Sequence, residues 1–249
     1  MIGIDLGSRH IKIAQMKDGK IIKTAIFDTV QFYRRYGMAG QKKLSINLEE
    51  LGFPKDKLTA TGYGKAAVTV EGAVHIPEIQ AHAVGAVFQS GLNDFTLLDI
   101  GGQDTKIIMV REGQVADFLT NDRCAASSGR YMENMADVLG ISLADLSLYS
   151  EDPVSLNSTC AIFGETEIIS KIAEGYSISQ LAAGVNFTLY RRFAAQLRQM
   201  HSEKLVLSGG GAFNSALIAI IAGQTGCETI RVENYQFNGA IGCCVFGCS

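Results

Sequence analysis

Two segments of the chain repeat one pattern at an offset of 94 residues, from Asp5 to Asp99, and this repeat constrains the fold more than any other feature. The first segment reads DLGSRHIKIAQMKDGKII and the second reads DIGGQDTKIIMVREGQVA. Each follows a short apolar run and holds Asp-Gly or Glu-Gly in its middle, a pair typical of a β-hairpin turn. The repeat is too long for a solenoid unit, so we expect two similar domains.

Strand and helix patterns alternate along the chain, which predicts an α/β fold. We expect a first domain over residues 1–90, completed by a C-terminal helix over 238–249, and a second domain over 91–237. Apolar runs predict strands at 97–100, 106–110 and 204–210. Helical spacing predicts a helix after Pro77 and others over about 129–139, 161–174, 178–201 and 212–225.

The composition excludes several classes of protein. Glycine contributes 27 of 249 residues and proline only 3, which favours tight backbone turns over a collagen or a Pro-rich linker. A net charge of −3 gives no basic excess for nucleic acid or an anionic membrane. No apolar run reaches the roughly 18 residues of a membrane span, and no signal peptide is recognised. We therefore expect a cytoplasmic protein whose six cysteines are thiols or metal ligands.

The two repeated segments are candidate phosphate-binding loops. A strand that ends in Asp-x-Gly brings backbone N–H groups close to an anion, because glycine has no Cβ. Two such loops can hold a polyphosphate between them, and their aspartates can hold Mg²⁺ through water molecules. The alternative is a pair of hairpins whose glycines serve the turns alone. The candidate residues are Asp5, Gly7, Ser8, Asp99, Gly101, Gly102 and Gln103.

A third glycine cluster, Gly209-Gly210-Gly211, ends an apolar strand and opens the helix expected from Ala212. Three consecutive glycines let the backbone pass against a flat ligand or a phosphate. The alternative is an ordinary turn between strand and helix. Neither the P-loop pattern nor the dinucleotide-binding G-x-G-x-x-G pattern occurs in the sequence.

Two Asp-x-Gly hairpins and a late Gly-Gly-Gly loop resemble the actin, sugar-kinase and heat-shock-chaperone ATPase superfamily. That resemblance implies two ribonuclease-H-like domains with ATP in the cleft between them. Within the superfamily, the chain most resembles the BadF/BadG/BcrA/BcrD ATPase family, whose nearest members are ATP-driven iron–sulfur activators of 2-hydroxyacyl-CoA dehydratases. The matching stretches are ATGYGKAAV (60–68), EIQAHAVGA (78–86), LLDIGGQDTKII (97–108), NDRCAASSGRYMENMADVLGI (121–141), STCAIFGETEIIS (158–170), LSGGGAFN (207–214) and NGAIG (238–242).

The resemblance implies a role for individual residues of the ATP site. Asp5 and Asp99 are expected on the Mg²⁺ side of the nucleotide, and Glu78 is expected to orient the attacking water. An anionic acceptor suits that task, although a glutamate on a helix surface is the alternative. Phosphate contacts are expected from Gly7, Ser8, Gly101, Gly102 and Gln103, and the nucleoside loop from Gly209, Gly210, Gly211 and Asn214.

Cys124 and Cys160 each precede a predicted helix, where a helix N-terminus favours the thiolate and metal ligation. Chemistry alone favours two free thiols, because two cysteines cannot complete the four-cysteine shell of a cluster. The resemblance implies instead that the two chains of a homodimer share one [4Fe–4S] cluster. The sequence departs from the family at Ser127, where members carry glycine.

The remaining cysteines and the histidines are expected to be structural. Cys243, Cys244 and Cys248 favour apolar packing, with a second metal site as the alternative, and Cys227 is expected to be an ordinary thiol. His82 is interpreted as a packed helix residue. The other histidines, His10, His75 and His201, form no metal-ligand pattern with it.

The resemblance implies a homodimeric ATPase that couples hydrolysis of ATP to ADP to low-potential transfer of a single electron. A ferredoxin or flavodoxin would supply the electron. The partner would be a 2-hydroxyacyl-CoA dehydratase, a benzoyl-CoA reductase or a double-cubane cluster protein. One alternative is a small-metabolite kinase that resembles pantothenate kinases, and another is an actin-like scaffold without enzyme activity.

Overall fold

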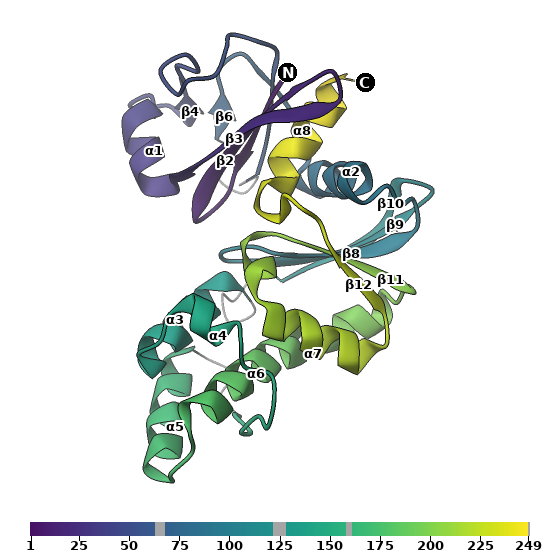
Figure 1. Ribbon diagram of the computed structural model, residues 1–249. Coiled ribbons are helices and arrows are strands. Elements are labelled where there is room, and N and C mark those ends of the chain that lie inside the picture. Colours follow the sequence, from purple (N-terminus) through teal and green to yellow (C-terminus); the bar gives the residue numbers. More distant parts are fainter. Residues whose placement is uncertain (63–67, 122–127, 158–160, 249) are drawn as a thin grey trace. The chain divides into compact units, whose positions relative to one another are not determined.

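The computed structural model describes residues 1–62, 68–121, 128–157 and 161–248, and it confirms the predicted α/β class (Figure 1). The chain divides into two compact units. Unit 1 comprises Met1–Asp94, Val110–Asp117 and Val232–Ser249, and unit 2 comprises Phe95–Met109 and Phe118–Arg231.

The described residues form two five-stranded sheets, and the two sheets have the same strand order. The first sheet runs β3-β2-β1-β5-β7 and the second runs β10-β9-β8-β11-β12. In the first, β1 (Ile2–Leu6), β2 (His10–Lys17) and β3 (Lys20–Asp28) are antiparallel, whereas β5 (Leu58–Thr61) and β7 (Ala73–His75) run parallel to β1. The second sheet consists of β8 (Phe95–Ile100), β9 (Thr105–Arg111), β10 (Gln114–Asn121), β11 (Lys204–Ser208) and β12 (Glu228–Arg231).

The hairpin turns show the duplication at the level of backbone angles. Asp18 and Gly19 join β2 to β3 with φ angles of 51° and 71°. Glu112 and Gly113 join β9 to β10 with φ angles of 51° and 72°. Positive φ at both central residues is what a type I′ turn requires in a two-residue hairpin. The shared turn and the shared strand order confirm the predicted repeat.

The helices of unit 1 are α1 (Thr29–Tyr36), α2 (Glu78–Ser90) and α8 (Asn238–Cys248). Helix α8 packs very closely on both β1 and α2. A Cβ atom at Gly3 would collide with the carbonyl oxygen of Ala240, and one at Gly242 would collide with that of Ala81. Part of the glycine excess therefore serves close helix packing.

The three C-terminal cysteines lie on α8 and differ in burial. Cys243 and Cys244 are fully buried, which confirms their predicted packing role. Burial raises the pKa of the Cys244 thiol to about 12 and raises the pKa of the Cys243 thiol well above its usual value. The packing prediction is wrong for Cys248, which is exposed because it lies in the last turn of the helix.

Unit 2 contains the longest helix, α6 (Ile178–Gln199), which begins with a capping box formed by Ser177 and Gln180. The predicted helix from Ala212 begins later, because a 3₁₀ turn over Gly210–Phe213 intervenes. The Oδ1 atom of Asn214 then accepts a 2.9 Å hydrogen bond from the Leu217 N–H and caps α7. The other helices of this unit are α3 (Gly129–Leu139), α4 (Leu143–Leu146), α5 (Ala161–Ala173) and α7 (Ser215–Thr225).

A minor sheet of two short strands, β4 (Lys43–Leu44) and β6 (Thr69–Val70), completes unit 1.

Across the described part of the chain, we find no helix with the length and apolar character needed to cross a membrane.

Candidate functional site

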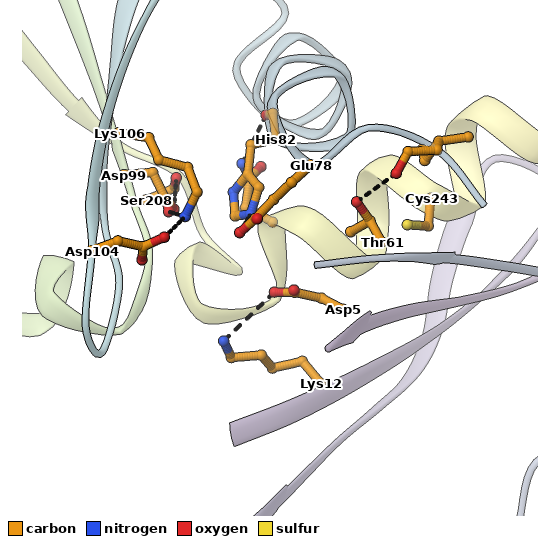
Figure 2. Close-up of polar contacts among 12 residues, drawn as sticks. Asp5, Lys12, Thr61, Glu78, His82, Asp99, Asp104, Lys106, Ser208 and Cys243 are labelled. Atoms are coloured by element: carbon orange, nitrogen blue, oxygen red, sulfur yellow. Dashed lines mark hydrogen bonds and ion pairs between the residues drawn. The ribbon is translucent and has the colours of Figure 1, made fainter. Parts of the chain in front are cut away.

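In unit 2, the side chains of Asp104, Lys106 and Ser208 lie around the buried carboxylate of Asp99 at the end of β8 (Figure 2). Ser208 Oγ donates a 2.7 Å hydrogen bond to Asp99 Oδ1. Lys106 Nζ lies 3.6 Å from Asp99 Oδ2 and 2.9 Å from Asp104 Oδ2. The ammonium group therefore compensates the charge of the buried carboxylate.

Unit 1 repeats this pair with Asp5 and Lys12. The two residues face each other in the β1–β2 register, and Lys12 Nζ lies 3.5 Å from Asp5 Oδ2. Asp5 is as buried as Asp99, but the Lys12 side chain is 16% exposed whereas that of Lys106 is 5% exposed. The repeated aspartate and lysine of the sequence thus form one ion pair in each unit.

The difference in burial predicts different costs for removing the two lysines. Lys106→Met leaves Asp99 buried without its ammonium partner, and we expect this to lower the free energy of unfolding by about 3–5 kcal/mol. Lys12→Met should cost less, because water reaches that site more easily. Urea unfolding of both variants beside the parent chain measures the difference. Equal costs would contradict this account.

The loop that follows Asp99 closes on itself. The Gly101 N–H donates a 2.9 Å hydrogen bond to the Asp104 carbonyl, and a Cβ at Gly101 would collide with the Asp104 side chain. Gly101, Gly102 and Gln103 are all partly exposed. A tight, accessible loop of this kind suits an anion that is bound by backbone N–H groups.

The same loop is hydrogen bonded to the beginning of α3. The carbonyls of Gly101 and Gly102 accept hydrogen bonds of 2.9 and 3.0 Å from the N–H groups of Gly129 and Arg130. Ser128 is fully buried, and its Oγ donates a 3.0 Å hydrogen bond to the Gly102 carbonyl. A displacement of this loop would therefore act directly on the first turn of α3.

The three consecutive glycines have different surroundings. Gly209 has a φ of 84°, and a Cβ there would lie 2.8 Å from the Ile100 backbone nitrogen. Gly211 also packs against Ile100, whereas a Cβ at Gly210 would have no atom within 4 Å. Asn214 is fully buried, and its Nδ2 donates a 2.8 Å hydrogen bond to the Asn186 side chain. Of these candidates, Gly210 has open space beside it.

In unit 1, Glu78 and His82 lie one turn apart at the beginning of α2 (Figure 2). Glu78 is partly exposed and His82 is buried, with 3.9 Å between His82 Nε2 and Glu78 Oε1. One ligand atom each from Asp5, Glu78 and His82 lies within 4.8 Å of the other two. The sequence interpretation of His82 as a packed residue missed this grouping, although the Glu-x-x-x-His spacing was a signal.

The predicted cluster ligands Cys124 and Cys160 lie outside the described residues, as does Ser127. The described chain resumes at Ser128, immediately before α3, and at Ala161, the first residue of α5. Gly7 and Ser8 follow β1 and are partly exposed. Cys227 is partly buried, and its Sγ lies 3.1 Å from the Ser202 carbonyl, in keeping with an ordinary thiol.

Known proteins match this chain over almost its whole length. A model of the BadF/BadG/BcrA/BcrD ATPase family matches residues 2–247. The activator of lactoyl-CoA dehydratase from Anaerotignum propionicum is 35% identical, over 98% of this chain and 96% of that protein. Component A of (R)-2-hydroxyglutaryl-CoA dehydratase from Acidaminococcus fermentans has a TM-score of 0.84 at 30% identity, over 99% of this chain and 96% of that one.

A second solved structure is the activator of 2-hydroxyisocaproyl-CoA dehydratase from Clostridium difficile with bound ADPNP. It has a TM-score of 0.81 at 28% identity, over 99% of this chain and 93% of that one. Together with the two sheets of equal strand order, these matches confirm the predicted fold of two ribonuclease-H-like domains.

Proposed function

This chain belongs to the BadF/BadG/BcrA/BcrD ATPase family, and we propose that it is a homodimeric ATPase that drives single-electron transfer to an iron–sulfur partner enzyme. Each subunit would hydrolyse ATP, and the two subunits would share one [4Fe–4S] cluster. Relatives between 30% and 35% identical are named as activators of 2-hydroxyacyl-CoA dehydratases, which supports the activator role.

The Asp-x-Gly hairpins support the binding of ATP. Each hairpin places a buried aspartate, paired with a lysine, beside a partly exposed loop. The carboxylates of Asp5 and Asp99 are the oxygen donors that Mg²⁺ prefers, so both fit that ion through water molecules. When bound, Mg²⁺ neutralises charge on the phosphates. Glu78 is accessible at the beginning of α2, where its carboxylate can accept a hydrogen bond from the attacking water.

The hydrogen bonds between the loop after Asp99 and the first turn of α3 support a coupling between the nucleotide and the cluster. They join a candidate phosphate-binding loop to the helix that begins five residues after Cys124. Loss of the γ-phosphate would change the contacts of Gly101 and Gly102, and their carbonyls are fixed to Gly129 and Arg130. A nucleotide-dependent shift of this loop would therefore move the chain next to Cys124.

Cys124 and Cys160 are the residues that would hold the cluster. Two thiolates from each chain complete the four-cysteine shell of a [4Fe–4S] cluster in a twofold-symmetric dimer. Helix α5 begins directly after Cys160, and a helix N-terminus stabilises negative charge. When bound, the cluster supplies a one-electron carrier. A ferredoxin or flavodoxin would reduce it, and a 2-hydroxyacyl-CoA dehydratase is the partner that the names of the relatives favour.

Anaerobic purification followed by iron, sulfide and electron-resonance measurements tests this proposal. We expect one [4Fe–4S] cluster per two chains, Mg²⁺-dependent ATP hydrolysis, and faster reduction of the partner enzyme when ATP is present. Iron-free protein whose ATP turnover is stimulated by a small alcohol or amide would support a metabolite kinase instead. Filaments that sediment with ATP would support an actin-like scaffold.

A further inference from the structure

We infer that Asp5, Glu78 and His82 form a site that binds a first-row transition metal ion, such as Mn²⁺ or Fe²⁺, directly and without nucleotide. All three residues belong to unit 1, on β1 and α2. Their ligand atoms lie within 4.8 Å of one another, and His82 Nε2 is 3.9 Å from Glu78 Oε1. Two atoms bound to one ion at about 2.1 Å lie at most about 4.2 Å apart, so small side-chain rotations suffice.

One carboxylate oxygen of Asp5 can still accept a ligand. Asp5 is 3% exposed, and its Oδ1 atom has no hydrogen-bond partner among the described residues. A buried oxygen without a hydrogen bond is costly, and a bound cation would remove that cost. Lys12 Nζ lies 3.5 Å from Oδ2 and offsets one negative charge, so the carboxylates of Asp5 and Glu78 together still favour a cation.

Two glycines keep space open around this carboxylate. A Cβ at Gly239 would lie 2.9 Å from His82 Nε2 and 3.1 Å from Asp5 Oδ2, so any larger residue would fill the space between the ring and the carboxylate. A Cβ at Gly62, whose φ is 92°, would lie 2.8 Å from Asp5 Oδ1. Glycine at these two positions therefore leaves room beside each carboxylate oxygen of Asp5.

Hydrogen bonds between α8 and α2 fix the backbone at His82, the residue that supplies the third donor. The side chain of Asn238 donates a 2.9 Å hydrogen bond to the His82 carbonyl, and Gln89 donates a 2.9 Å hydrogen bond to Asn238. These bonds fix the start of α8, and with it Gly239, beside the His82 turn of α2.

The donor set selects the class of ion. Mg²⁺ prefers oxygen donors and retains its water ligands, whereas imidazole nitrogen favours first-row transition metals. One imidazole with two carboxylates thus suits Mn²⁺ or Fe²⁺. This direct site differs from the water-mediated Mg²⁺ contact proposed for ATP hydrolysis, and it does not depend on that activity.

Binding of Mn²⁺ to the oxidised, nucleotide-free protein, followed by pulsed electron resonance, tests the inference. Mn²⁺ avoids thiolates better than Zn²⁺ does, and coupling to nitrogen that changes when the histidines carry ¹⁵N reports an imidazole ligand. We expect this coupling in the parent protein. His82→Gln should abolish it and raise the Mn²⁺ dissociation constant at least about tenfold.

His201→Gln provides the matched control, because His201 is an exposed histidine outside the cluster, and it should keep both the coupling and the affinity. Mn²⁺ bound without nitrogen coupling in the parent protein would overturn the inference, and so would unchanged coupling in His82→Gln. The parent measurement decides the matter even where a variant folds poorly. Failure of the proposed ATPase would appear in hydrolysis assays and would leave this nucleotide-free result unaffected.

Discussion

Glu78→Gln slows ATP hydrolysis by about 10²- to 10⁴-fold, on our account, while Mg²⁺-ATP still binds. The substitution keeps the size of the side chain and removes the negative charge that positions the attacking water. Glu78 is partly exposed at the first turn of α2, so the amide should fit without a change of fold. Steady-state phosphate release measures the rate, and equilibrium nucleotide binding measures the affinity.

Glu49→Gln is the matched control, because Glu49 is an exposed glutamate of the same unit. Its hydrolysis rate should equal that of the parent protein. Glu78→Gln with a parental rate would remove Glu78 from the proposed mechanism. Equal loss of binding and turnover would indicate a role in holding the nucleotide instead.

Cys124→Ser and Cys160→Ser should each abolish the spectrum of the [4Fe–4S] cluster and the reduction of the partner enzyme. Both variants should still bind nucleotide. Each substitution in a symmetric dimer removes two of the four proposed thiolates, and the remaining two cannot complete the shell of the cluster. Iron and sulfide content, visible absorption and electron resonance of the reduced protein measure this loss.

Cys248→Ser controls for the general effect of losing a thiol, because Cys248 is exposed at the end of α8. It should keep a full cluster. Retention of a full cluster by both Cys124→Ser and Cys160→Ser would contradict their assignment as ligands. Loss of the cluster in Cys248→Ser as well would indicate that the C-terminal cysteines are needed for the cluster.

Local sequence patterns predicted the longer helices α2, α3, α5, α6, α7 and α8 and the strands β8, β9 and β11, because the period of apolar residues is a local property. They did not predict the short helices α1 and α4. The helix expected over 129–139 is α3, and the strand expected at 97–100 lies within β8. The repeat predicted two equal hairpins, which the turns at Asp18 and Glu112 confirm. The predicted start of α7, at Ala212, was wrong. Asn214, three residues after the last glycine, is the N-cap residue, so α7 begins at Ser215.

The candidate site was predictable only in part. The Asp-x-Gly pattern and the family resemblance identified Asp5 and Glu78. His82 was interpreted as a packed helix residue, because the Glu-x-x-x-His spacing does not by itself show that Asp5 lies beside both side chains. The burial of Lys106 against two carboxylates was equally hidden, since lysines at equivalent repeat positions have the same local pattern.

The duplication, the α/β class and the two Asp-x-Gly hairpins were predictable from the residues, because these features depend on residues close together in the chain. Asp5 on the first strand comes beside His82 on α2 only when the chain folds, and Gly239 of α8 then lies against both. Folding also joins the loop after Asp99 to the start of α3. Such contacts join residues distant in sequence, and packing of sheet against helix decides them rather than local propensity.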